Sequence, residues 1–199
     1  NISVAKAIDR IHELGMKVML KPMVDPLDGH WRGEIPPSDS WFQSYDNFIN
    51  FWAEFAQQYQ VELLCIGCEY NSNDNQTADW QIVTQGVRQR YTGPITYAAN
   101  WDNYPNVHWW DLLDYVGIDA YFPLTLVDDP TVSELKAGWS PWISAIASWQ
   151  ATVNKPVIFT EIGYRSGQGA NKAPWDWVTS LPVDLQEQLD CYDATFQAF

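Results

Sequence analysis

Apolar residues along the chain recur with two different spacings, and each spacing predicts one kind of element. In the segment VAKAIDRIHELG, Ala5, Ile8, Ile11 and Leu14 recur at helical spacing, and Gly15 is placed as a C-terminal stop. A longer amphipathic run at 41–59 follows a Ser/Asp cluster that is typical of helix caps. The same reasoning predicts six helices, at 4–15, 41–59, 78–91, 109–113, 132–153 (interrupted around 139–141) and from about 183 to the terminus.

Short runs that are apolar almost throughout lie between these helices. They are KVMLKPMV, VELLCIG, ITYAA, YVGIDAYF and KPVIFTEIG. Strands of this kind, each separated from the next by a helix, indicate a parallel sheet that is covered on both faces. We therefore expect an α/β fold with about five parallel strands.

The length and the strand count limit which α/β fold this can be. A (β/α)₈ barrel needs eight strands and about 250 residues. The chain has 199 residues and five predicted strands. With no linker or repeat in the sequence, we expect residues 1–199 to form a single domain that is a partial barrel.

Composition excludes several functions. The formal net charge of −14 argues against nucleic acid or an anionic membrane as a partner. No apolar run approaches the ~20 residues needed to span a bilayer, so we expect a soluble protein. The 12 Trp, 10 Tyr and 8 Phe suit either a core or the faces of sugar rings. Of the three cysteines, Cys65 and Cys68 would point to opposite faces of a strand, which favours buried free thiols.

Polar residues at the carboxyl ends of the predicted strands are the candidates for a site, because parallel α/β folds bind ligands there. Glu69 in LLCIGCEY and Glu161 in VIFTEIGY stand out, since each continues the buried face of an apolar strand. A charged group in such a place is costly unless it is paired or useful. A salt bridge to a nearby Lys or Arg is the plain alternative for either glutamate.

A pair of carboxyl groups is what glycoside hydrolysis requires. One protonates the leaving oxygen, and in a retaining enzyme the other attacks the anomeric carbon. The three histidines lack metal-ligand spacing, no glycine-rich phosphate loop follows a strand, and no G-x-S-x-G motif is present. We therefore expect no metal and no organic cofactor.

Six ordered blocks of sequence resemble glycoside hydrolase family 113, the β-mannanases of the large retaining clan with (β/α)₈ barrels. They are LKPMVDPLDGHWRGEI, WFQSYDNFINFWAEFA, IGCEY, GPITYAANW, LDYVGIDAYFPL and KPVIFTEIGYRS. The resemblance implies that Glu69 ends the fourth barrel strand as the general acid/base, and that Glu161 ends the seventh as the nucleophile. It also implies a set of substrate-binding residues: Tyr121 beside the nucleophile, Trp101 stacked on a sugar, and Asn100, His30, Trp31, Arg32, Lys21 and Asp119.

Two departures from the family pattern qualify these expectations. Cys68 stands where the clan usually has Asn, which contacts the sugar 2-hydroxyl. The five strands correspond to strands three to seven of the barrel, so we expect a fragment that either associates through its open sheet edges or needs further segments to be fully active. The expected partner is a β-mannan-type polysaccharide or oligosaccharide. The alternatives are a clan relative that acts on another β-glycan and a non-catalytic carbohydrate-binding module.

Overall fold

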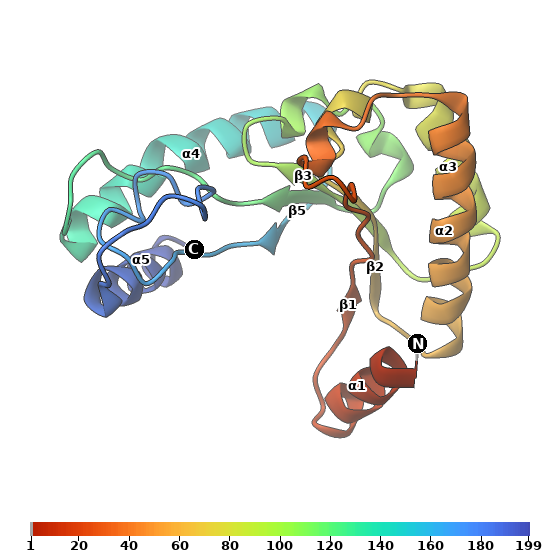
Figure 1. The fold of residues 1–199 in the computed structure, drawn as a ribbon, viewed down its shortest axis with the longest axis horizontal. Coiled ribbons are helices and arrows are strands. Elements are labelled where there is room, and N and C mark those ends of the chain that lie inside the picture. Colours follow the sequence, from red (N-terminus) through yellow and green to blue (C-terminus); the bar gives the residue numbers. More distant parts are fainter. Residues whose placement is uncertain (1) are drawn as a thin grey trace. The chain divides into compact units, whose positions relative to one another are not determined.

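A five-stranded sheet in the order β1-β2-β3-β4-β5 is the main feature of the computed structural model, which describes residues 2–199 (Figure 1). The first pairs, β1 with β2 and β2 with β3, are parallel. The strands are β1 (Met19–Leu20), β2 (Leu63–Cys68), β3 (Ile95–Asn100), β4 (Val116–Asp119) and β5 (Val157–Glu161). All five predicted strands are confirmed. The first is shorter than predicted, because Pro22 interrupts its apolar run and has no N–H to donate to a neighbour.

Helices alternate with the strands along the chain. They are α1 (Ile2–Glu13), α2 (Asp39–Gln58), α3 (Thr77–Arg88), α4 (Val132–Val153) and α5 (Leu185–Ala198). Short 3₁₀ turns occur at η1 (Arg32–Glu34), η2 (Asn71–Asn73), η3 (Tyr104–Asn106) and η4 (Trp110–Leu112). The helix predicted at 109–113 is thus only the 3₁₀ turn η4. None of the helices within residues 2–199 is both long and apolar enough to cross a membrane.

The predicted interruption around 139–141 is wrong, because α4 runs unbroken through Pro141. Two features hold this helix together. Thr131 and Glu134 form a reciprocal capping box at its start. Trp139 is fully buried, and its indole N–H donates a 3.0 Å hydrogen bond to Thr195 Oγ1 of α5. Tertiary packing against α5 therefore outweighs the local cost of the proline.

The chain divides into two compact units. The first contains the residues up to 118 together with 155–158, and the second contains 119–154 with 159–199. In the first unit α2 and α3 lie side by side (Figure 1), and an aromatic cluster of Trp80, Tyr97 and Trp109 fills the core. In the second unit α4 packs on α5. As predicted, Cys65, Cys68 and Cys191 are buried and form no disulfide.

Candidate active site

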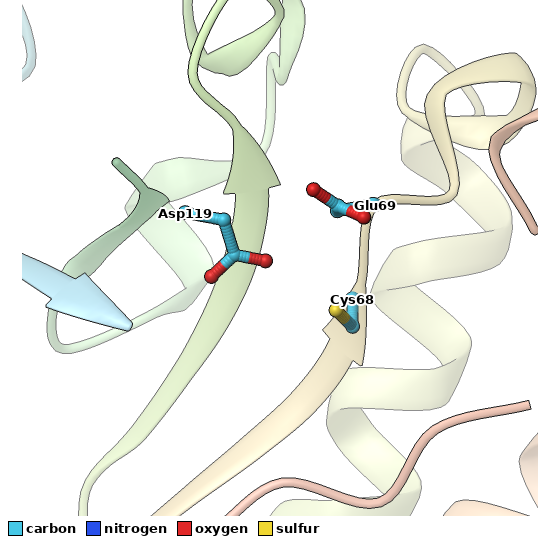
Figure 2. A group of neighbouring side chains, drawn as sticks. All are labelled: Cys68, Glu69 and Asp119. Atoms are coloured by element: carbon cyan, nitrogen blue, oxygen red, sulfur yellow. The ribbon is translucent and has the colours of Figure 1, made fainter. Parts of the chain in front are cut away.

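Glu69 follows the last residue of β2, where the sequence predicted a functional carboxylate (Figure 2). Its side chain is 12% exposed, and the five residues of β2 that precede it are buried. Its backbone has a φ of +54°, in the left-handed region that residues other than glycine rarely adopt. The Glu69 N–H donates a 2.8 Å hydrogen bond to Ala98 O of β3. The carboxylate thus stands at the carboxyl end of a buried strand on an unusual backbone turn.

Two side chains of the loop after β1 contact the Glu69 carboxylate. Arg32 Nη1 lies 3.2 Å from Glu69 Oε2, and the indole N–H of Trp31 donates to the same oxygen at 3.5 Å. Arg32 Nε is also 2.8 Å from Asp25 Oδ1. Burial lowers the pKa of Arg32, but the hydrogen bond to Asp25 and the charges of Cys68, Asp25 and Glu69 raise it above its usual value. Arg32 is therefore a permanent cation beside Glu69, and the salt bridge that was the plain alternative for this glutamate does form.

Glu161 is the last residue of β5, and Tyr121 lies two residues beyond the end of β4. The Tyr121 hydroxyl donates a 2.7 Å hydrogen bond to Glu161 Oε2, and the Ala120 N–H donates to Glu161 O at 2.8 Å. A hydroxyl donor at this distance stabilises the ionised carboxylate and fixes its orientation. The structure therefore brings the predicted Tyr121 and Glu161 together.

Asp119 is the last residue of β4 (Figure 2). Its side chain is fully buried. It accepts a 2.7 Å hydrogen bond from Thr160 Oγ1 of the neighbouring strand β5. A buried carboxylate with a strand-to-strand partner has a clear structural role. Direct contact of Asp119 with a substrate remains only a prediction.

The other predicted binding residues occupy mixed surroundings. The His30 side chain is 70% exposed and pairs with Asp28 at 3.1 Å. Trp31 is 41% exposed, and its ring covers Gly33 so closely that a Cβ there would lie 2.3 Å from the indole. The remaining residues, Lys21, Asn100 and Trp101, are partly buried. The Asn100 Oδ1 atom is buried and accepts no hydrogen bond from the described residues.

The sequence analysis did not identify Asp74 and Tyr97 as site residues. The Tyr97 hydroxyl accepts a hydrogen bond from the N–H of Tyr70, the residue after Glu69, and donates one to Asp74. Asp74 belongs to the polar stretch NSNDN, which is typical of a solvated loop, yet it is 1% exposed. Tyr97 lies within the apolar run ITYAA and has the pattern of a core residue. No signal in the sequence could have joined them, since their contact depends on how the loop after β2 folds back over β3.

Comparison with known proteins identifies both a family and similar solved structures. The sequence profile of Glycoside Hydrolase Family 113 matches residues 1–199. The chain belongs to glycoside hydrolase family 113. It is 31% identical to the β-mannanase AaManA from Alicyclobacillus acidocaldarius, solved in complex with ManMIm, with a TM-score of 0.88 over 98% of this chain. A complex structure of a GH113 β-1,4-mannanase matches at 29% identity and a TM-score of 0.87, also over 98% of this chain.

The family relationship also defines the extent of the fold. The chain spans 62% of the length of each of these mannanases, so it is a partial (β/α) barrel, as predicted. A β-glucuronidase from Ruminococcus gnavus shares the fold at 14% identity and a TM-score of 0.65, over 97% of this chain and 34% of its own. Among curated proteins, no match to the chain was found.

Proposed function

We propose that the protein is a retaining endo-β-glycosidase that hydrolyses β-mannan-type polysaccharide. Its membership of a glycoside hydrolase family and its similarity to β-mannanases support the reaction class. The observation that carries the proposal is the Tyr121 hydroxyl, which donates a 2.7 Å hydrogen bond to Glu161 at the end of β5. This bond suits a carboxylate that must be ionised and oriented in order to attack.

In the first step Glu161 is the nucleophile and Glu69 is the acid. A Glu161 oxygen forms a bond to the anomeric carbon while the bond from that carbon to the leaving oxygen breaks, and the Glu69 proton moves to the leaving oxygen. In the second step Glu69 takes a proton from water, whose oxygen attacks the same carbon and releases Glu161. This route requires the two carboxyl groups to lie about 5–5.5 Å apart in the working enzyme.

Arg32 has a distinct part in this scheme. Once Glu69 has given up its proton, it carries a negative charge, and the guanidinium 3.2 Å away stabilises that charge. Asp25 pairs with the same guanidinium and keeps Arg32 in place. Its negative charge also offsets part of the positive charge that favours loss of the proton from Glu69. The exposed Trp31 ring, which is held over Gly33, offers a flat apolar face on which a sugar can stack.

The other proposed substrate-binding residues are chosen because they lie at or after the carboxyl ends of strands. Asn100 and Trp101 come at the carboxyl end of β3, and Lys21 follows β1. The buried and unpaired Oδ1 atom of Asn100 supports a role for this residue, since a buried acceptor gains from a hydroxyl donor. His30 and Asp119 complete the proposed set.

The test is release of reducing sugar from β-mannan by the wild type and by the variants Glu69→Gln and Glu161→Gln. Each variant should lose at least about 100-fold in kcat, since each removes a group that takes part in bond making or proton transfer. Glu54→Gln is the matched control, because Glu54 is an exposed helix residue paired with Arg90. Unchanged activity in either active-site variant would refute the assignment.

Two alternatives remain, and the same assay separates them. A clan relative acting on another β-glycan would hydrolyse glucan or xylan in preference to mannan. A non-catalytic carbohydrate-binding module is the second alternative, because the chain spans 62% of the length of the mannanase that it resembles. Binding of manno-oligosaccharides without any hydrolysis would favour that reading.

A further inference from the structure

The backbone at Glu69 needs an external restraint. Its φ of +54° costs energy for a residue with a Cβ, and such conformations persist only where the surroundings impose them. Hydrogen bonds fix the peptide units on both sides of this residue. The Glu69 N–H donates to Ala98 O at 2.8 Å, and the N–H of Tyr70 donates to the Tyr97 hydroxyl oxygen, also at 2.8 Å. The second bond is unusual because a side chain, not the backbone, receives it.

The Tyr97 hydroxyl can accept from Tyr70 because its own proton is committed elsewhere. It donates a 2.5 Å hydrogen bond to Asp74 Oδ1, and Asn103 Nδ2 donates to the other oxygen of the same carboxylate at 2.5 Å. In its ionised form, above its pKa of about 7, the Asp74 carboxylate only accepts hydrogen bonds, so the phenol is the donor in their contact. The phenol oxygen is then left to accept from the Tyr70 N–H.

The phenol itself is held firmly in place. Tyr97 is fully buried, and its ring centroid lies 5.3 Å from that of Trp80 and 5.0 Å from that of Trp109. Gly67 of β2 makes room for the ring, since a Cβ there would lie 2.7 Å from it. Asp74 is anchored separately, because the indole N–H of Trp109 donates to its backbone oxygen at 2.9 Å.

A purely structural role would not require a carboxyl group at this place. Asp74 is 1% exposed, and burial raises its pKa to about 7 although the hydrogen bonds from Tyr97 and Asn103 lower it. Apolar side chains of the same shape fill a core at less cost. The buried carboxyl group of Asp74 therefore stabilises the fold less than an apolar side chain of the same shape would, and it lies one hydrogen bond from the Tyr97 hydroxyl that holds the backbone next to Glu69.

We propose that Asp74 and Tyr97 are positioning residues for the general acid/base. Asp74 orients the Tyr97 hydroxyl, the hydroxyl holds the Tyr70 N–H, and this bond maintains the left-handed turn that aims the Glu69 carboxyl group at the leaving oxygen. The inference rests on the proposed role of Glu69 in proton donation. Neither residue needs to touch the substrate.

Substrates that differ in their need for a proton test this role. Release of a mannosyl leaving group from mannohexaose requires protonation, whereas 2,4-dinitrophenol leaves from an aryl β-mannobioside without it. In Tyr97→Phe, kcat/KM for mannohexaose should fall by about 10- to 100-fold, as expected for a misaligned catalytic group. For the dinitrophenyl substrate, kcat/KM should stay within about threefold of the wild type. Asp74→Asn should give the same pattern with a smaller loss.

Tyr91→Phe is the matched control. Tyr91 is also buried, and its hydroxyl donates a 2.7 Å hydrogen bond to Val61 O, just before β2 begins. This variant should show no difference between the two substrates. An equal loss on both substrates in Tyr97→Phe, or no loss on either, would overturn the proposal.

The proposed role of Glu69 is checked by Glu69→Gln in the same assay. If Glu69→Gln treats the two substrates alike, the acid/base assignment itself fails. If Glu69→Gln discriminates between the two substrates and Tyr97→Phe does not, only the positioning role of Asp74 and Tyr97 fails. Should the chain hydrolyse neither substrate, hydrogen exchange at the Tyr70 amide decides. Exchange that is faster in Tyr97→Phe than in Tyr91→Phe supports the proposal, and equal exchange in the two variants overturns it.

Discussion

Replacement of Asp74 by Asn should make the stability of the protein less sensitive to alkaline pH. Asp74 is 1% exposed, and its pKa is raised from 3.8 to about 7, mainly by burial. Asn has nearly the same shape and no charge to lose or gain. The substitution therefore removes one titration from the folded state with little change in volume.

The direction in which stability changes with pH follows from proton binding by Asp74. Between about pH 4 and pH 7 the folded protein keeps a proton on Asp74, while the unfolded chain has released it. The stabilisation is thus fully present below about pH 4 and is lost as the pH rises through 7. A separation of about 3 pH units at about 1.4 kcal/mol each corresponds to about 4 kcal/mol, of which about 2–3 kcal/mol falls between pH 5 and pH 8.

The assay is urea unfolding of the wild type and of Asp74→Asn at pH 5 and at pH 8, followed by tryptophan fluorescence. Asn cannot accept hydrogen bonds from both Tyr97 and Asn103, and the resulting change in the variant's stability is the same at both pH values because Asn does not titrate. The comparison is therefore the difference between variant and wild type at each pH. That difference should move in favour of the variant by about 2–3 kcal/mol at pH 8 relative to pH 5. A difference that is equal at the two pH values would show that Asp74 does not titrate with a raised pKa in the folded protein.

Further predictions concern the nucleophile, the core and the sheet edges. Tyr121→Phe removes the 2.7 Å hydrogen bond to Glu161 and should lower kcat on mannan by about 10- to 100-fold, which steady-state kinetics measures. Gly67→Ala places a Cβ 2.7 Å from the Tyr97 ring and should cost about 1–3 kcal/mol in thermal unfolding, whereas Gly163→Ala, with its nearest contact at 3.5 Å, should be close to neutral. The edge strands β1 and β5 should promote self-association of the chain, and a monomer at all concentrations in size-exclusion chromatography with light scattering would contradict this.

The sequence predicts the elements well where periodicity is strong and local. The helix α2 and the presence of five strands follow from apolar spacing, and Glu69 and Glu161 are identified because each continues a buried strand face. The errors occur where tertiary contacts decide. Pro141 predicts a break in α4, but the buried Trp139 and its bond to α5 keep the helix continuous.

The sequence does not predict the contacts that surround the candidate site. That Arg32 contacts Glu69 depends on how the loop after β1 folds, and a loop of mixed polar residues carries no periodic signal for its path. Asp74 is a similar case, because aspartate in a stretch rich in Asn and Asp is usually solvated. Its burial results from three long-range bonds, to Tyr97, Asn103 and Trp109, that no local pattern encodes.

The proposed mechanism depends on a covalent bond between Glu161 and the sugar. The direct measurement is incubation with an activated 2-deoxy-2-fluoro-β-mannosyl substrate, which slows the second step, followed by proteolysis and mass spectrometry of the peptides. We expect one fluoromannosyl adduct, located on Glu161 and lost in Glu161→Gln. An adduct on a different residue, or turnover of mannan with inversion of anomeric configuration and no adduct, would contradict it.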